Sequence, residues 1–159
     1  MPRPPDPESF RKACAQFATG ITIVSLRAPN GTPHGLTVNS FTSVSINPPL
    51  ILVCIDYGCA LLPYFRLANF FAVNILTQEQ RSLSISFAVK PEGRFDGIHW
   101  HAGSTGAPIL SGVLAFFECR TSQIAEAGDH AIVIGEVVRS ECSTGNPLVY
   151  FDSNYRVLR

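Results

Sequence analysis

The chain has 159 residues, of which 46% are hydrophobic and 15% charged, and its twelve basic and twelve acidic residues give a formal net charge of zero. This length suits a single domain over residues 1–159, and the charge balance disfavours nucleic acids and anionic membranes as partners. Because a typical soluble domain is about 25% charged, the low charged fraction predicts apolar surface that is covered in a homo-oligomer.

The N-terminal segment and the cysteines bear on location. Residues 1–7 are rich in proline and are expected to form a flexible arm, without the apolar stretch of a signal peptide. No run approaches the ~20 apolar residues that a membrane helix requires. The five cysteines are odd in number and irregularly spaced, which argues against a disulfide framework. These features predict a cytoplasmic protein.

Helical and strand patterns can be followed in chain order. A helix is predicted to begin near Glu8 or Ser9, with Ser9 as a candidate N-cap, and to end at Gly20. A short helix is predicted over residues 62–68, and a capping box formed by Thr77 and Gln80 predicts another. Strands are predicted over residues 21–26, 36–38, 50–55, 70–76, 109–121 and 131–140.

The order of these elements indicates the fold class. Many short strands with few helices, and no regular alternation of strand and helix, are typical of a mainly β protein. We therefore expect a β-barrel or sandwich with accessory helices. Glycine-rich dinucleotide and phosphate loops are absent from the sequence, and so is the G-x-S-x-G turn of a hydrolase.

The sequence His99-Trp100-His101 has the spacing of a candidate metal-binding pair. The chain has only two further histidines, His34 and His130, and no acidic residue stands beside the pair. We therefore interpret this segment as a loop with two exposed imidazoles around a packing tryptophan, and we predict no metal site.

Hydroxyl and amide side chains are concentrated in residues 35–45, between two otherwise apolar strands. Short polar side chains and exposed backbone amides suit a flavin, which takes many hydrogen bonds along its ring edge and phosphate. The alternative is a Ser/Thr-rich strand with one solvated face. The pattern alone does not decide between the two.

The same segment carries a family resemblance. Residues 37–45, followed by Asn47-Pro48-Pro49-Leu50, strongly resemble the flavin reductase-like family, the small reductase components of two-component flavin monooxygenases. Further segments resemble the family in the same order along the chain: residues 10–13, 17–22, 71–76, 93–95, 128–130 and 135–137. The resemblance covers nearly the whole chain, from Phe10 to about Leu158.

The resemblance implies an FMN-binding split β-barrel that forms a homodimer. It implies FMN as the flavin, with FAD as an alternative, and NADH or NADPH as co-substrate. The residues that match the family's flavin-binding segments are Thr37, Val38, Asn39, Ser40, Ser43, Asp56, Tyr57, Ala60, Arg94 and Phe95. His130 matches the catalytic histidine placed near the nicotinamide, and Tyr155 matches an aromatic residue that flanks the same pocket.

Each of these assignments has a plain structural alternative. Arg94 could be a surface cation and Phe95 a core residue. Tyr155 could be a packed aromatic side chain, and His130 could cap a hairpin.

The chain departs from the family pattern after Asp56. Family members commonly carry Ser and Thr hydroxyls there that hold the flavin phosphate, whereas residues 57–62 offer only the phenol of Tyr57. Losing several charge-assisted hydrogen bonds, at ~1.5–3 kcal/mol each, weakens phosphate binding. Backbone amides of residues 58–61 are the expected compensation.

The implied function is a flavin reductase. It transfers hydride from a reduced nicotinamide to N5 of FMN or FAD, and the reduced flavin then serves a separate monooxygenase. Two alternatives remain open from the sequence. One is a non-catalytic flavin-binding electron carrier, and the other is a flavin-free barrel that binds another ligand.

Overall fold

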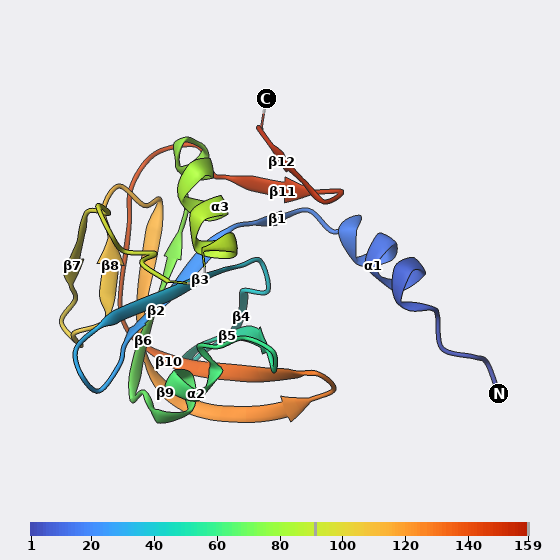
Figure 1. Ribbon diagram of the computed structural model, residues 1–159, viewed down its shortest axis with the longest axis horizontal. Coiled ribbons are helices and arrows are strands. Elements are labelled where there is room, and N and C mark those ends of the chain that lie inside the picture. The colour runs from blue at the N-terminus through green and yellow to red at the C-terminus, as the bar shows by residue number, and fades with distance from the viewer. Residues whose placement is uncertain (91, 159) are drawn as a thin grey trace.

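The structure is a computed structural model that describes residues 1–90 and 92–158. Its elements in chain order are α1 (Pro7–Ala15), β1 (Thr19–Gly20), β2 (Thr22–Arg27), β3 (Pro33–Val38), β4 (Thr42–Ile46), β5 (Pro49–Asp56), α2 (Leu62–Leu67), β6 (Phe70–Ile75), the 3-10 turn η1 (Gln78–Gln80), α3 (Arg81–Val89), β7 (Trp100–Ala102), β8 (Pro108–Leu110), β9 (Ala115–Ala127), β10 (His130–Cys142), β11 (Val149–Phe151) and β12 (Asn154–Arg156) (Figure 1).

Seven strands form the main sheet, in the order β3-β2-β6-β9-β10-β5-β4, with antiparallel neighbours throughout. Two smaller sheets, β1-β11-β12 and β7-β8, lie beside it. The mainly β class with accessory helices is confirmed. The main sheet is open, because its outer strands β3 and β4 are not paired with each other in the described part of the chain.

The first helix begins earlier and ends earlier than the sequence predicts. Asp6 is the N-cap and accepts hydrogen bonds from the backbone amides of Glu8 and Ser9, while Pro7 occupies the first turn. Asp is as good an N-cap as Ser, and proline suits the first helical position because it lacks an N–H. The prediction of Ser9 as the cap was therefore wrong, and the proline-rich arm ends at Asp6.

The predicted strand over residues 109–121 is two strands. β8 ends at Leu110, a turn follows in which Gly112 has a φ of 72°, and β9 begins at Ala115. The apolar run continues across this turn, so the hydrophobic pattern alone did not reveal it. The two long strands β9 and β10 then form a hairpin, and the β10 side of its tip pairs with the end of β5, with His130 opposite Asp56 (Figure 1).

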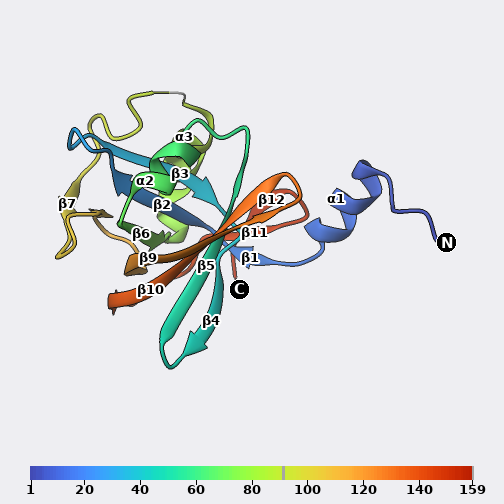
Figure 2. The same cartoon turned by 90° about the horizontal axis from the view of Figure 1, so that it is seen from below.

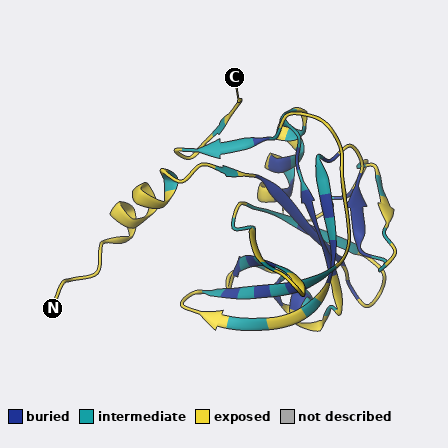
Figure 3. Cartoon of the chain, turned by 180° about the vertical axis from the view of Figure 1, so that it is seen from behind, coloured by how far each residue is buried: buried dark blue, intermediate teal, exposed yellow. Residues whose placement is uncertain are grey.

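The hydrophobic core forms two clusters, one on each side of the main sheet's central strands. Phe87 of α3 packs with Ile23 and Leu76 in the first cluster. Phe65 of α2 packs with Phe71 and the buried residues of β5 in the second. Figure 3 shows these buried segments at the centre of the strand body.

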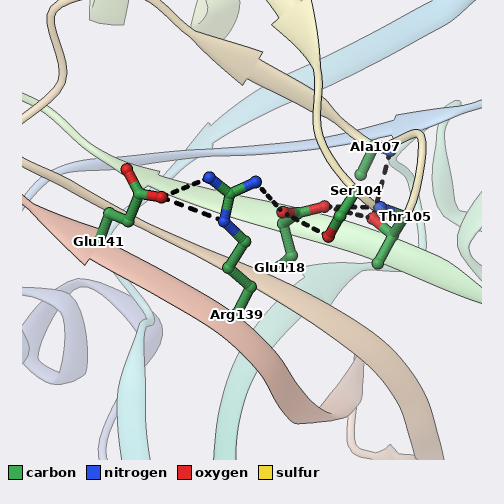
Figure 4. A network of polar contacts seen from close by, with 6 residues as sticks. All are labelled: Ser104, Thr105, Ala107, Glu118, Arg139 and Glu141. Atoms are coloured by element: carbon green, nitrogen blue, oxygen red, sulfur yellow. Dashed lines mark hydrogen bonds and ion pairs between the residues drawn. The ribbon is translucent and has the colours of Figure 1, made fainter.

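A buried carboxylate ties a loop to the sheet. Glu118 on β9 is fully buried and accepts hydrogen bonds from the amide and the hydroxyl of Thr105, both at 2.8 Å, and from Ser104 Oγ at 3.1 Å (Figure 4). The guanidinium of Arg139 lies 3.5 Å from the same carboxylate. A buried charge needs such partners, so Glu118 fixes the loop between β7 and β8 to the strand pair β9-β10.

Helix α1 stands apart from the rest of the chain (Figures 1 and 2). None of its residues is buried, and the nearby Phe17 is 79% exposed. Its C-terminal end is attached to the β11-β12 turn, where the amide of Asp152 donates to the carbonyl of Ala15 at 2.8 Å. Among the described residues, no helix has the length and apolar character needed to cross a membrane.

Candidate functional site

The Ser/Thr-rich segment runs from the end of β3 into the bend before β4. Thr37 Oγ1 donates a hydrogen bond of 2.6 Å to the carbonyl of Ser84 on α3. Ser40 Oγ accepts from the amide of Cys54 at 2.9 Å and donates to the Cys54 carbonyl, so it pairs with the edge of β5. The hydroxyls of Thr37 and Ser40 therefore hold the segment in place, while Asn39 is exposed.

Val38 and Ser43 border this bend. Val38 is half-buried at the end of β3, and its carbonyl accepts a hydrogen bond from Thr22 Oγ1. Ser43 is exposed on β4, opposite Ile51 of β5. Backbone groups of the bend, together with Asn39 and Ser43, form the polar surface that the segment presents.

Tyr155 of β12 reaches the same region through α3. Its hydroxyl lies 2.8 Å from Ser84 Oγ, on the residue whose carbonyl binds Thr37. The guanidinium of Arg81 lies over the Tyr155 ring at 5.1 Å from its centroid. Ser84 of α3 therefore links Tyr155 to Thr37 of the predicted flavin segment, through its hydroxyl on one side and its carbonyl on the other.

Arg94 lies in the loop after α3 and is fixed against β3. Its Nη1 donates to the carbonyl of Gly35 at 2.7 Å, and its Nε donates to the carbonyl of Lys90. The neighbouring Phe95 is 9% exposed and packs edge-on against Phe87 and Trp100, with centroid distances of 5.0 and 5.7 Å. Phe95 is thus a core residue that positions Arg94.

A cavity of about 440 Å³ lies where these loops meet. It is lined by residues 32–35 of the β3 start, by Ala60, Leu61 and Tyr64 after β5, and by residues 92–96 after α3. The cavity therefore brings together Ala60, Arg94 and Phe95 of the predicted flavin-binding set. Its volume falls in the range of about 300–1,000 Å³ that is typical of ligand pockets.

His130 lies at the start of β10, opposite Asp56 in the register of β5. Its Nδ1–H donates to the carboxylate of Asp129 at 2.6 Å, and its Nε2 lies 4.0 Å from Asp56 Oδ2. The hydrogen bond from His130 lowers the pKa of Asp129 below its usual value. The three side chains bring ligand atoms within 4.8 Å of one another, so His130 is half-buried beside two carboxylates.

The segment after Asp56 is fixed by polar contacts of its own. Tyr57 donates a hydrogen bond to Glu126 of β9, and this carboxylate also pairs with Arg66 of α2 at 2.7 Å. The Gly58 amide donates to Asp56 Oδ1, and the Cys59 amide donates to the Asp56 carbonyl. Two of the four backbone amides expected to hold a phosphate are therefore occupied, which corrects that expectation for residues 58 and 59.

The predicted residues thus fall into two groups. Thr37, Arg94 and Tyr155 gather around α3 and β3, whereas His130 lies with Asp56 at the β9-β10 hairpin. Tyr155 belongs to the small β1-β11-β12 sheet and His130 to the main sheet. Within the described part of a single chain, His130 and Tyr155, the two residues predicted to contact the nicotinamide, are not in contact with each other.

The histidines at 99 and 101 lie partly on a strand. Trp100 and His101 belong to β7, which pairs with β8, so the expectation of a loop was wrong for these two residues. Both imidazoles are exposed, and Trp100 packs against Phe95, which is the arrangement expected around a packing tryptophan.

Three residues of the site were not singled out from the sequence. Ser84 joins Thr37 to Tyr155, while His34 and Tyr64 stack on each other at the cavity wall with centroids 4.7 Å apart. His34 and Tyr64 are 30 positions apart in the chain, and no motif connects them. The only local signal was the position of His34 at the head of the Ser/Thr-rich strand.

Known proteins resemble the chain over most of its length. The family model described as "Flavin reductase like domain" matches residues 14–159. An FMN reductase (NADH) of Agrobacterium fabrum (strain C58) is 43% identical over 143 residues, which are 89% of this chain and 80% of that protein. The reductase subunit of a stachydrine N-demethylase from Rhizobium meliloti (strain 1021) is 40% identical over 150 residues, or 94% of this chain.

Among solved structures, the NADH:FAD oxidoreductase of Streptomyces globisporus C-1027 superposes with a TM-score of 0.92 at 32% identity, covering 100% of this chain and 97% of that one. The same oxidoreductase in complex with NAD and FAD fragments gives a TM-score of 0.93. The chain spans 65% of the stachydrine demethylase subunit and 48% of a second Rhizobium meliloti relative that is 44% identical.

Proposed function

The chain belongs to the flavin reductase-like domain family, and from that premise we propose that it is an NAD(P)H:flavin oxidoreductase. The observation that supports the proposal is a cavity that holds Ala60, Arg94 and Phe95 of the predicted flavin-binding set, where Arg94 offers a cation fixed on the Gly35 carbonyl of β3. The proposed cofactor is FMN or FAD and the proposed hydride donor is NADH or NADPH; the names of two relatives state FMN with NADH for one and FAD with NADH for the other.

The residues present fit a flavin. Asn39, Ser43 and the backbone of the β3–β4 bend offer donors and acceptors for the edge of a planar ring system. Arg94 is half-buried and donates to two carbonyls, so its guanidinium is already oriented for a phosphate. The phosphate is therefore assigned to Arg94 and to the Ala60–Leu61 backbone, since residues 57–62 lack the usual hydroxyls.

A bound flavin supplies the hydride acceptor, N5 of its ring, and hydride transfer to it needs no strong acid or base from the protein. The protein contributes orientation. His130 positions the nicotinamide, with its imidazole held by Asp129 through Nδ1. Tyr155, held by Ser84, is assigned to flank the nicotinamide from the α3 side of the flavin segment.

We further propose that two copies of the chain form a homodimer. Ile46 on the outer strand β4 is 93% exposed, Phe17 is 79% exposed, and α1 buries nothing on its own chain. Exposed apolar side chains on an edge strand favour association with another copy. A second copy also offers a way to bring a His130 close to a Tyr155 of the other chain.

The reduced flavin is proposed to leave for a separate monooxygenase component. This rests on the relatives, one of which is the reductase subunit of a demethylase. A cytoplasmic location is proposed with it, because the chain's five cysteines are free and the proposed reaction consumes reduced nicotinamide.

Steady-state oxidation of NADH and of NADPH, with FMN, FAD or riboflavin added in turn, tests the function. We expect flavin-dependent turnover, and we expect His130→Ala to lower kcat/KM for the nicotinamide on the order of 10-fold because the donor ring is less well oriented. His101→Ala, which removes an exposed histidine on β7, is the matched control.

Absence of turnover from folded protein would contradict the proposal. A flavin spectrum without turnover would then indicate an electron carrier. A colourless protein that binds no flavin would indicate a barrel for another ligand.

A further inference from the structure

A second cavity, of about 350 Å³, lies apart from the one assigned to the flavin. Its walls are the end of β2 with Arg27 and Pro29, the corner over residues 67–70 between α2 and β6, and the loop over residues 105–107 between β7 and β8. Among the described residues, Tyr64 alone lines both cavities. The volume falls in the range of about 300–1,000 Å³ that is typical of ligand pockets.

Arg27 and Phe70 reach this cavity from neighbouring strands. β2 and β6 are paired as far as Ser25 and Ala72, and Arg27 and Phe70 each lie two residues beyond that pair. Because side chains alternate between the faces of a sheet, both lie on the same face as Ser25, whose hydroxyl donates to the carbonyl of Pro108 at 2.6 Å. Both side chains therefore face the loop that precedes β8.

The cavity has a cation and, among its described lining residues, no acidic side chain. The guanidinium of Arg27 lies over the Trp100 ring at 5.1 Å from its centroid, which orients it. In the described part of the chain, no carboxylate lies within ion-pair distance of this guanidinium. Asn69 is exposed at the same cavity, where its side-chain amide is a further donor. These groups favour an anion, and a planar guanidinium matches a carboxylate through two hydrogen bonds.

The corner between α2 and β6 supplies an apolar wall. Leu67 is 71% exposed and Phe70 is 38% exposed, so their own chain leaves both side chains in contact with water. A small inorganic anion on Arg27 would leave this apolar surface in water. An organic carboxylate with an apolar body would cover it, which is favourable through the hydrophobic effect.

Hydrogen bonds within the chain preform both of the outer walls. Thr105 is fixed to the buried carboxylate of Glu118 through its amide and its hydroxyl, both at 2.8 Å (Figure 4). On the other side, Thr121 donates its amide to the Asn69 carbonyl and its hydroxyl to the Ala68 carbonyl, both at 2.9 Å. A cavity that is already ordered loses little conformational entropy when a ligand binds.

We propose that this second cavity is a binding site for a small organic carboxylate with an aromatic or aliphatic body. The carboxylate binds the guanidinium of Arg27, and the apolar body covers Leu67 and Phe70. The site lies outside the proposed flavin and nicotinamide sites, and the proposal does not depend on the proposed flavin reductase function.

Titration of the full chain with hydrocinnamate, followed by two-dimensional amide NMR, tests both binding and location. A ligand of this size is expected to bind with a Kd on the order of 1 mM. The amide signals of Asn69 and of residues 105–107 should shift and saturate, while those of residues 92–96 in the flavin cavity should stay unchanged. Absence of saturable shifts, or shifts centred on residues 92–96, overturns the proposal.

Two related ligands separate the charge from the apolar body. Hydrocinnamamide keeps the ring but is uncharged, and acetate keeps the charge but lacks the ring. Each is expected to bind on the order of 10-fold more weakly than hydrocinnamate, because each loses one of the two kinds of contact. Equal affinity of hydrocinnamate and its amide overturns the proposal.

Variants of the two walls give a second test. Arg27→Gln removes the charge and is expected to raise the Kd of hydrocinnamate on the order of 10-fold. Leu67→Ser shortens the apolar wall at an exposed position, so the fold is kept while the Kd rises about 3-fold or more. Arg11→Gln, which removes an exposed arginine on α1, is the matched control and should leave the Kd unchanged. Unchanged affinity in either folded wall variant overturns the proposal.

The affinity for FMN distinguishes this site from the flavin site. Arg27→Gln and Leu67→Ser are expected to bind FMN as wild type does, since neither residue lines the flavin cavity. Equal losses of FMN and hydrocinnamate affinity in Arg27→Gln would make the two cavities one site and overturn the proposal. A wild-type chain that binds hydrocinnamate but shows no flavin-dependent turnover removes the reductase function and leaves this site in place.

Discussion

Arg94 is the residue on which the flavin assignment depends most directly. Its side chain donates to the carbonyls of Gly35 and Lys90, so the guanidinium is fixed between β3 and the end of α3. A fixed guanidinium loses little conformational entropy when it binds a phosphate, and its planar donors match phosphate oxygens. The loss of the usual hydroxyls in residues 57–62 makes this cation more important here.

The change Arg94→Gln tests this role. It keeps a donor for the Gly35 carbonyl but removes the charge, so we expect the Kd of FMN to rise about 10- to 100-fold, the equivalent of about 1.5–3 kcal/mol for a charge-assisted hydrogen bond. Riboflavin lacks the phosphate, and its affinity is expected to stay within a factor of about two. Fluorescence titration measures both. An equal loss for the two ligands would mean that Arg94 supports the fold of the loop instead.

Residue-scale prediction from the sequence succeeded where the signal was local. The capping box of Thr77 and Gln80 is present, with Gln80 accepting from the Thr77 amide. The stack of His34 on Tyr64 could not be predicted, because it depends on how α2 packs against β3. The same holds for the amides of residues 58 and 59, whose partners are set by the conformation after Asp56.

At the scale of elements, the site depends on the packing of α3 against β3. Gly35 makes this packing close: a Cβ there would lie 2.9 Å from a ring carbon of Phe87 and 3.1 Å from the Val24 carbonyl oxygen. Both neighbours are buried, so neither can move without disturbing the core.

We therefore expect Gly35→Ala to lower the free energy of unfolding by about 1–3 kcal/mol, the usual cost of overpacking. It is also expected to weaken flavin binding, because β3 and Arg94 would shift together. Urea unfolding and flavin titration measure the two effects. Gly20→Ala is the control, since a Cβ at Gly20 meets nothing within 4 Å. Unchanged stability in Gly35→Ala would show that the α3 contact is looser than the structure indicates.

The contact between β9 and the β7–β8 loop depends on pH, because it is made by the carboxylate of Glu118. Burial by itself raises the pKa of Glu118, but the hydrogen bonds from Thr105 and Ser104 outweigh it and leave the pKa below the usual value of 4.5. Because the folded-state pKa is the lower one, the carboxylate stabilises the protein above about pH 4.5. This contribution is lost as the pH falls through the folded-state pKa.

The expected result for Glu118→Gln is a loss of about 1.5–3 kcal/mol at neutral pH, from the charged hydrogen bonds that disappear. Below pH 4.5 the unfolding free energy should fall less steeply with pH than in wild type. Urea unfolding over a pH series measures both. Glu136→Gln, which breaks an exposed ion pair with Arg120, should cost at most about 1 kcal/mol. Parallel pH profiles for wild type and Glu118→Gln would contradict the prediction.

The fold itself was predictable at this scale because strands and helices carry local patterns, and the family resemblance supplied their arrangement. The break at Gly112 was missed because apolar residues continue through the turn into β9. The helix start at Pro7 was missed because Ser9 and Asp6 are both good caps and only the structure shows which one is used.

On the scale of the whole molecule, α1 is the element whose role the single chain does not explain. It buries none of its residues, yet its sequence places Phe10 at helical spacing from Ala13, Cys14 and the nearby Phe17. An apolar stripe of this kind is stable in water only when something covers it. A second copy of the chain is the proposed cover.

Deletion of residues 1–15 tests whether this segment serves the fold of the chain or the contact between two copies. The remaining chain should keep its far-UV circular dichroism for strands, because no core contact is lost. Light scattering after gel filtration is expected to show a dimer for the full chain and a larger monomer fraction for the deletion. A full chain that is monomeric at micromolar concentration would contradict the homodimer.

The attachment of α1 has a consequence for how such copies would meet. The amide of Asp152 donates to the Ala15 carbonyl, and Asp152 and Ser153 adopt positive φ values of 50° and 58° that shape the turn beneath the helix. These contacts hold α1 in one direction relative to the β-sheets. Dimer formation then costs little conformational entropy, because α1 is already ordered in each chain. The direction of α1 also sets the relative orientation of the two chains.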